Sequence, residues 1–235
     1  MIAVLAAAAL AAVTALPVVT AAPTAAPTPA PDAVVAKYAA ALKALREPRV
    51  FSVEYTIEQT GMRSLEQTHR IFRSGGDERD ETIAVNGNRS RKPVVRVFHR
   101  RPYRYTVGAL APKPAAYDFV YAGPHRDGKH LDYVFTLVPK AKPPPLAFTQ
   151  VAIDGVTFLP RSVAFASRAH AAAGSVSFVK NDRYWVAVAA NAQANVQGGV
   201  AREQLAFANW RFPKALPRST FALPRPLPTL LPAPP

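Results

Sequence analysis

The 235-residue sequence contains no cysteine. Disulfide bonds, iron–sulfur clusters, thiol nucleophiles and cysteine-based zinc sites are therefore excluded. Acidic residues are scarce, because 15 Asp and Glu stand against 29 Lys and Arg, which gives a formal net charge of +14. Such an excess of positive charge attracts polyanions, which include nucleic acid, anionic lipid headgroups and acidic polysaccharides. The charge alone does not choose among these partners.

Motifs that position catalytic groups or metals are also missing. The sequence has no nucleophile elbow, no glycine loop that cradles a phosphate and no paired zinc-ligand motif. The best metal candidate is the segment GPHRDGKH, which holds His125, Asp127 and His130. Its spacing fits no helix face, and the neighbouring Arg126 and Lys129 would repel a cation. We interpret this segment as a solvated hairpin loop.

One run of carboxylates resembles the pairs that perform acid–base catalysis. Glu78 and Asp80 share one face of a predicted strand, Glu81 lies on the other, and Arg73 and Arg79 flank them. Catalysis would need a raised pKa, and nothing in the sequence indicates burial. We interpret the run as surface salt bridges. The sequence therefore predicts no catalytic residue, no metal, no cofactor and no enzymatic activity.

The two ends of the chain differ in composition from its middle. Residues 1–22 are almost all apolar, residues 23–31 are rich in Pro, Ala and Thr, and residues 222–235 are mostly Pro and Leu. The first segment is typical of a cleaved signal peptide or of an uncleaved membrane anchor, and we keep both alternatives. We expect a linker at 23–31, one β domain at 32–221 and a disordered tail at 222–235. An exported protein of the periplasm or cell envelope is predicted, anchored by residues 2–22 in one of the two alternatives.

The apolar pattern of the middle segment predicts one helix followed by many strands. Asp32 is expected to cap a helix over 33–45, with an apolar stripe at helical spacing made of Val34, Val35, Tyr38, Ala41, Leu42 and Leu45. From residue 50 the period changes to two, which is typical of half-buried strands. Strands are expected at 50–58, 66–73, 78–85, 93–99, 103–107, 117–122, 131–138, 148–153, 161–166, 174–180, 184–197 and 201–212. Turns are expected at Asn86-Gly87-Asn88, at Asp154-Gly155, where glycine supplies a positive φ, and in a polar loop over 123–129. The fold class is mainly β (α+β): a curved antiparallel sheet or incomplete barrel with the helix packed on its concave face.

One face of these strands is strongly apolar. A single helical stripe covers only part of so wide a sheet, so the facing residues either form an ordinary core or line a cavity for an apolar ligand. The candidate ligand-binding residues are Val53, Tyr55, Ile57, Tyr133, Phe135, Leu137 and Phe207.

A basic segment with interleaved aromatic residues lies between residues 89 and 104. No acidic residue occurs from Arg89 to Tyr117. Such a patch can bind nucleic acid, but an export signal argues against that partner. The segment is either a solvated edge strand that discourages aggregation or a contact for anionic headgroups and phosphate groups. In the second alternative the basic rim consists of Arg96, Arg100, Arg101 and Arg104.

The order of these features resembles a known family. The resemblance depends on three motifs. They are a Y-x-F-x-L-x-P strand that begins at Tyr133, an I-D-G-x-x-x-L-P hairpin that begins at Ile153, and a closing F-x-N-W-R-F-P run that begins at Phe207. Over residues 34–221 the chain resembles the outer-membrane lipoprotein-sorting (LolA/LolB-like) superfamily. The resemblance implies an incomplete antiparallel barrel with an apolar concave face lidded by helices, and a carrier or sensor that holds acyl chains without catalysis. The basic segment and the Pro-rich tail depart from that pattern, and no lid-locking arginine can be assigned.

These features together predict an exported, non-enzymatic, membrane-proximal domain that binds a lipid or the acyl chain of a lipoprotein in the cell envelope. The alternative is an envelope interaction or sensor domain whose basic face binds a protein or an anionic polymer. Nucleic acid is not an expected partner in either case.

Overall fold

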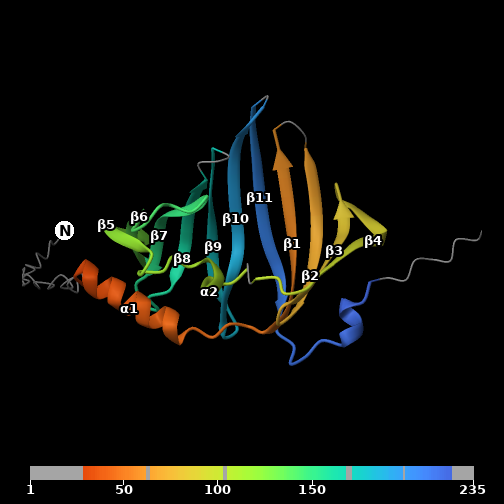
Figure 1. The fold of residues 1–235 in the computed structure, drawn as a ribbon, viewed down its shortest axis with the longest axis horizontal. Coiled ribbons are helices and arrows are strands. Elements are labelled where there is room, and N and C mark those ends of the chain that lie inside the picture. Colours follow the sequence, from red (N-terminus) through yellow and green to blue (C-terminus); the bar gives the residue numbers. More distant parts are fainter. Residues whose placement is uncertain (1–28, 62–63, 103–104, 168–170, 198, 224–235) are drawn as a thin grey trace, which may run out of the picture.

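Eleven strands hydrogen-bond into one antiparallel sheet in the computed structural model of the protein, which describes residues 29–61, 64–102, 105–167, 171–197 and 199–223 (Figure 1). The sheet is open, because β4 and β5 are its two edges and do not pair with each other. The predicted fold class is confirmed. The strands are β1 (Val50–Thr60), β2 (Leu65–Ser74), β3 (Asp77–Val85), β4 (Asn88–Phe98), β5 (Tyr117–Asp127), β6 (His130–Pro139), β7 (Leu146–Asp154), β8 (Pro160–Ser167), β9 (Ala172–Asn181), β10 (Tyr184–Val196) and β11 (Gly199–Arg211).

Two meanders make up the sheet. Strands β1 to β4 form one, strands β5 to β11 form the other, and they join where β1 pairs with β11 in the order β4-β3-β2-β1-β11-β10-β9-β8-β7-β6-β5. The chain must therefore cross from one edge of the sheet to the other after β4. This connection carries the short helix α2 (Val107–Leu110), which lies at the lower part of the sheet (Figure 1). Tyr105, Thr106 and Val107 are buried, so the connection contributes to the core.

Helix α1 (Pro31–Ala44) packs against the sheet with the predicted apolar stripe. Val34 and Tyr38 are fully buried, and the ring of Tyr38 lies 5.5 Å from that of Phe119 on β5. The Tyr38 hydroxyl donates a hydrogen bond of 2.8 Å to the carbonyl of Pro112, and burial raises the pKa of this phenol. The predicted cap is wrong: Ala30 is the N-cap residue and Asp32 lies in the first turn. Pro31 starts the helix two residues earlier because its fixed φ suits the first helical position.

Two of the turns between strands require glycine for different reasons. Asn86 and Gly87 both have positive φ, 48° and 74°, as the hairpin between β3 and β4 requires. Gly155 has no positive φ, so the conformational reason that we expected for it is wrong. A Cβ atom there would lie 2.8 Å from the carbonyl oxygen of Leu131, so close packing requires the glycine. The turn is held instead by Asp154, whose Oδ1 accepts hydrogen bonds from the backbone N–H groups of Val156 and Thr157.

Two local predictions fail near β4 and β5. Residues 103–107 do not form a strand within the described residues: Thr106 makes one isolated bridge to Val186, and α2 begins at Val107. The expected loop at 123–129 is mostly strand, because a bulge between Tyr121 and Gly123 lets β5 continue to Asp127. The bulge absorbs the one-residue change of register that breaks the period-two pattern. The metal candidates His125, Asp127 and His130 thus lie on the paired ends of β5 and β6.

The carboxylate of Asp132 gives the first testable prediction. Asp132 on β6 is buried, its Oδ1 has no hydrogen-bond partner within the described residues, and Arg161 Nε is 3.8 Å from Oδ2. Burial raises the pKa of this carboxyl, and the charge of Asp154 adds to the effect against the opposing charge of Arg161. The folded state therefore binds the proton of Asp132 more tightly than the unfolded state does. The free energy of unfolding is expected to fall as the pH rises from the unfolded-state pKa of Asp, about 3.9, through the higher folded-state pKa.

Asp132→Asn is accordingly expected to raise the melting temperature at pH 7.5, and the gain should shrink as the pH falls toward 4. Thermal unfolding at both pH values measures it. Asp118→Asn is the matched control, because Asp118 is exposed on neighbouring β5. A lower melting temperature for Asp132→Asn at pH 7.5 would show that its contact with Arg161 outweighs the cost of burial.

Candidate functional site

The inner face of the sheet carries an unbroken apolar row. Cross-strand partners share a face, so the register defines which residues stand side by side. One residue from each of eight successive strands lies in this apolar row, from β1 to β5: Ile57, Leu205, Ala190, Val176, Val163, Val151, Phe135 and Tyr121. Since α1 packs on Phe119, which lies two residues from Tyr121 on β5, this is the face that α1 covers.

The sequence-predicted ligand residues all lie on this inner face. Val53, Tyr55 and Ile57 stand on β1, Phe207 stands on β11, and Tyr133, Phe135 and Leu137 stand on β6. Most of them are buried, and Phe135 is 0% exposed. Tyr55 and Ile57 are half-buried. Within the set, therefore, the residues on β6 are core residues, and the residues at the upper part of β1 are the accessible ones.

The covering of the apolar row is uneven. At the β6 to β9 end its members are buried, whereas Ile57, Leu205 and Ala190 are only half-buried. Figure 1 shows the reason, since α1 and α2 lie across the lower part of the sheet and neither crosses the upper halves of β10, β11 and β1. This upper inner face is apolar along the row itself, carries Gln59 and Glu203 above it, and lies open beside the core.

The upper inner face carries small residues on β10, and we call the strip over Ala190 and Ala192 the trough. The row above the apolar row runs from Gln59 and Glu203 through Ala192 and Gly174 to Phe165. A Cβ atom at Gly174 would lie 2.6 Å from Cζ of Phe165, so the glycine lets this ring lie against β9. Ala190 and Ala192 continue the low floor on β10, between Phe165 on one side and Leu205 on the other. A floor of small residues between larger apolar side chains suits a narrow apolar ligand.

The same inner face becomes polar on β2 and β3. Arg73 and Glu78 are both 0% exposed, and Arg73 Nη1 lies 2.8 Å from Glu78 Oε2. Arg101 Nη1 lies 2.8 Å from the other carboxylate oxygen, and Arg73 also donates to the carbonyls of Gly75, Arg101 and Pro102. Our interpretation of Glu78 as a surface residue is therefore wrong. The crossing segment 99–102 covers it, and a two-residue pattern along β3 carries no sign of that distant cover.

A second buried polar pair separates this ion pair from the apolar row. Nδ1 of His69 lies 2.8 Å from Oδ1 of Asp80, and both side chains are buried. The imidazole stacks on the ring of Tyr55, with centroids 4.8 Å apart and planes 4° apart, and its Nε2 lies 3.4 Å from Gln67 Oε1. The group near His69 Nε2 is the amide oxygen of Gln67, which is not a nucleophile. Asp80, too, is buried where the sequence suggested a surface.

The predicted basic rim is only partly made of unpaired cations. Arg96 on edge strand β4 and Arg100 after it are exposed, and Arg100 has a φ of +54°. Arg101 is held by Glu78 and stacks its guanidinium 3.8 Å from the ring centre of Phe98. Arg104 lies outside the described residues. The structure thus places Arg96 and Arg100 at the surface and uses Arg101 inside the fold.

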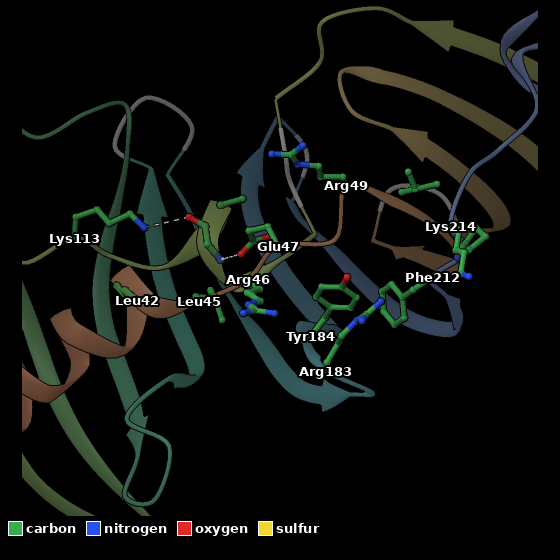
Figure 2. Close-up of a pocket in the computed structure, with 14 residues that line it drawn as sticks. Leu42, Leu45, Arg46, Glu47, Arg49, Lys113, Arg183, Tyr184, Phe212 and Lys214 are labelled. Atoms are coloured by element: carbon green, nitrogen blue, oxygen red, sulfur yellow. Dashed lines mark hydrogen bonds between the residues drawn. The ribbon is translucent and has the colours of Figure 1, made fainter.

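Sequence reasoning missed a basic pocket at the lower end of the sheet, with a volume of about 870 Å³ (Figure 2). Its lining comes from α1, the 45–50 connection, α2, the turn between β9 and β10, and the end of β11. No local motif joins segments so far apart in the chain, so only the fold reveals their meeting. Within the described residues, no group of three or more His, Asp or Glu side chains is placed to hold a metal ion. None of the helices in the described part of the chain is both long and apolar enough to span a bilayer.

Fold and site together define an open antiparallel half-barrel with a partly covered apolar inner face. No family model and no curated protein matches the sequence. Among solved structures, a LolA superfamily protein from Nitrosomonas europaea is 10% identical, with 82% of this chain and 97% of that chain covered and a TM-score of 0.43. A domain described as an outer membrane lipoprotein-sorting protein, from Vibrio parahaemolyticus, is 15% identical, with coverages of 79% and 94% and a TM-score of 0.46. A DUF1329 family protein from Desulfovibrio piger is 11% identical, with coverages of 81% and 96% and a TM-score of 0.47.

The first two of these structures bear the name of the family that the sequence resembles, at 10% and 15% identity.

Proposed function

We propose that this protein is an exported, non-enzymatic domain that binds a lipid or the acyl chain of a lipoprotein in the cell envelope. The observation that carries the proposal is the apolar row, which continues from the buried core to the half-exposed Ile57, Leu205 and Ala190. An acyl chain laid along this row would remove apolar surface from water on both partners, at about 25 cal/mol per Å². The small side chains of Ala190 and Ala192 leave room for such a chain beside the ring of Phe165.

The polar side of the inner face supports an amphipathic ligand. Gln67 and His69 stand beside Ile57 and Tyr55 on the neighbouring strand β2, so hydrogen-bonding groups border the apolar row. A hydrocarbon with a polar end matches this border, whereas a wholly apolar ligand leaves it unused. In this account Arg96 and Arg100 remain candidates for contact with an anionic headgroup, as the sequence predicts.

Titration of the full-length protein with a fluorescent fatty acid tests the proposal. The double variant Ile57→Asp, Leu205→Asp places two carboxylates on the apolar row and is expected to weaken binding about tenfold or more. Val120→Asp is the matched control, because Val120 is 54% exposed on β5 and points away from the inner face. A second variant, Ala192→Phe, fills the trough without charge and should also weaken binding.

Binding that survives both inner-face variants, or that the control weakens equally, would contradict the proposal. Failure of the wild-type protein to bind would also contradict it, and would leave the envelope interaction domain as the better account. One observation favours that second candidate: edge strand β4 exposes Arg89, Arg91, Lys92 and Arg96, which form a basic stripe suited to an anionic polymer.

A further inference from the structure

The pocket at the lower end of the sheet gathers positive charge from distant parts of the chain. Five basic side chains and one carboxylate line it: Arg46, Arg49, Lys113, Arg183, Lys214 and Glu47. These residues come from segments that are separate in sequence, and Figure 2 shows Arg183 and Lys214 beside the rings of Tyr184 and Phe212. The pocket is distinct from the upper inner face, and shares no residue with the apolar row.

Most of this positive charge is not neutralised by the protein. Within the part of the chain that the structure describes, the side chains of Arg46, Arg49 and Lys214 make no ion pair and no hydrogen bond. Lys113 donates only to the backbone carbonyl of Gly108, at 3.1 Å, and Arg183 lies 3.9 Å from the carboxylate of Asp182 beside it. Like charges gathered in a hollow raise the local potential and attract an anion.

The single carboxylate that lines the pocket, that of Glu47, has a structural role. Glu47 Oε1 accepts a hydrogen bond of 2.7 Å from the backbone N–H of Gly108, and its Oε2 is buried. A Cβ atom at residue 108 would lie 2.1 Å from Oε1, so a glycine is needed for this contact. Glu47 therefore ties the connection after α1 to α2, and Figure 2 shows its carboxylate directed at the backbone of α2.

Part of the wall of the pocket is apolar. Leu42 and Leu45 line it from α1, and the rings of Tyr184 and Phe212 lie with their centroids 4.7 Å apart. Walls of low dielectric constant strengthen the field of the basic groups. They also offer a surface that a simple inorganic ion would not use, which points to a ligand with an anionic group joined to an apolar part.

From this arrangement we propose that the pocket binds a phosphate ester of an apolar alcohol, the chemistry of an anionic lipid headgroup. Arginine guanidinium groups donate paired hydrogen bonds to phosphate oxygens, and lysine adds a point charge. The apolar part of the ester would lie on Leu42, Leu45, Tyr184 and Phe212. This second site stands independently of the acyl-chain site on the upper inner face.

Calorimetric titration of the full-length protein with monomeric dihexanoyl phosphatidic acid tests the proposal. The double variant Arg46→Gln, Lys214→Gln is expected to weaken binding about tenfold or more, because it removes charge-assisted hydrogen bonds. The matched control is Arg89→Gln, Arg91→Gln, which removes the same charge from exposed positions on β4 outside the pocket. The control is expected to change the affinity less than about twofold. The substituted residues are exposed in both double variants, so both proteins should fold. Their melting temperatures test this expectation.

One further ligand and one further variant separate a lipid headgroup from free phosphate. Inorganic phosphate should bind more weakly than the ester, and Tyr184→Ala should weaken only the ester. Equal affinity for both ligands, equal loss in the control pair, or no binding of the ester would overturn the proposal. The double variant Ile57→Asp, Leu205→Asp should bind the ester normally. If that variant alone loses the ester, the pocket proposal is overturned while the acyl-chain site stands.

Discussion

Replacement of Glu78 with glutamine is expected to lower the free energy of unfolding by about 3 kcal/mol or more. Both members of the Arg73–Glu78 pair have side chains that are 0% exposed, so the variant leaves a buried guanidinium without its compensating charge. The shape of the side chain is nearly unchanged, and the effect is therefore electrostatic. Arg101 also loses its partner, but its side chain is 23% exposed and can turn toward solvent.

Urea unfolding measures this effect, with Glu58→Gln as the control. Glu58 is exposed on β1, so the same chemical change there should alter the unfolding free energy by less than about 0.5 kcal/mol. The double variant Arg73→Met, Glu78→Leu should recover much of the loss, because apolar side chains can replace a buried ion pair at little cost. A loss below about 1 kcal/mol for Glu78→Gln would contradict the burial of this pair.

Removal of the Tyr38 side chain is the second change with a large expected effect. Tyr38→Ala should lower the unfolding free energy by about 3–5 kcal/mol, because it leaves a cavity against Phe119 and deletes the bond to the Pro112 carbonyl. Tyr38→Phe deletes only the hydroxyl and should cost about 1–2 kcal/mol. The difference between the two variants separates the packing of the ring from its hydrogen bond.

Hydrogen exchange locates the effect of Tyr38→Ala. Amides of α1 and β5 should lose protection before those of β10 and β11, because α1 is fixed to the sheet by Val34 and Tyr38. Lys43→Ala, an exposed change on the same helix, should leave the pattern unaltered. Uniform loss of protection across all strands would show that α1 is part of one cooperative core and not a separable cover of the inner face.

The sequence predicts the sheet well where its pattern is local. Alternation over residues 50–58 defines β1, and the Asn86-Gly87 turn joins β3 to β4 because both residues tolerate positive φ. The apolar stripe of α1 follows from helical spacing, and all six of its residues pack on the core. The fold class and the common face of the predicted ligand residues therefore follow from periods of 2.0 and 3.6 residues.

Features that depend on contacts between distant parts of the chain cannot be predicted from local sequence patterns. The burial of Glu78 results from the chain that crosses after β4, with Arg101 23 residues further along, and no pattern on β3 reveals this cover. The bulge in β5 interrupts the period-two pattern of that strand, so the pattern does not show how far the strand extends. The basic pocket assembles five segments, and its arginines and lysines look like ordinary surface charges in the sequence.

The most direct test of the acyl-chain site is native mass spectrometry of the full-length protein purified from cell envelopes, followed by organic extraction and identification of the bound molecule. The account predicts a bound mass in the range of a lipid on the wild-type protein and its loss from the double variant Ile57→Asp, Leu205→Asp, with Val120→Asp retaining it. A folded wild-type protein that carries no lipid and takes none up from added vesicles would contradict the account, and would show the inner face to be an ordinary packed core.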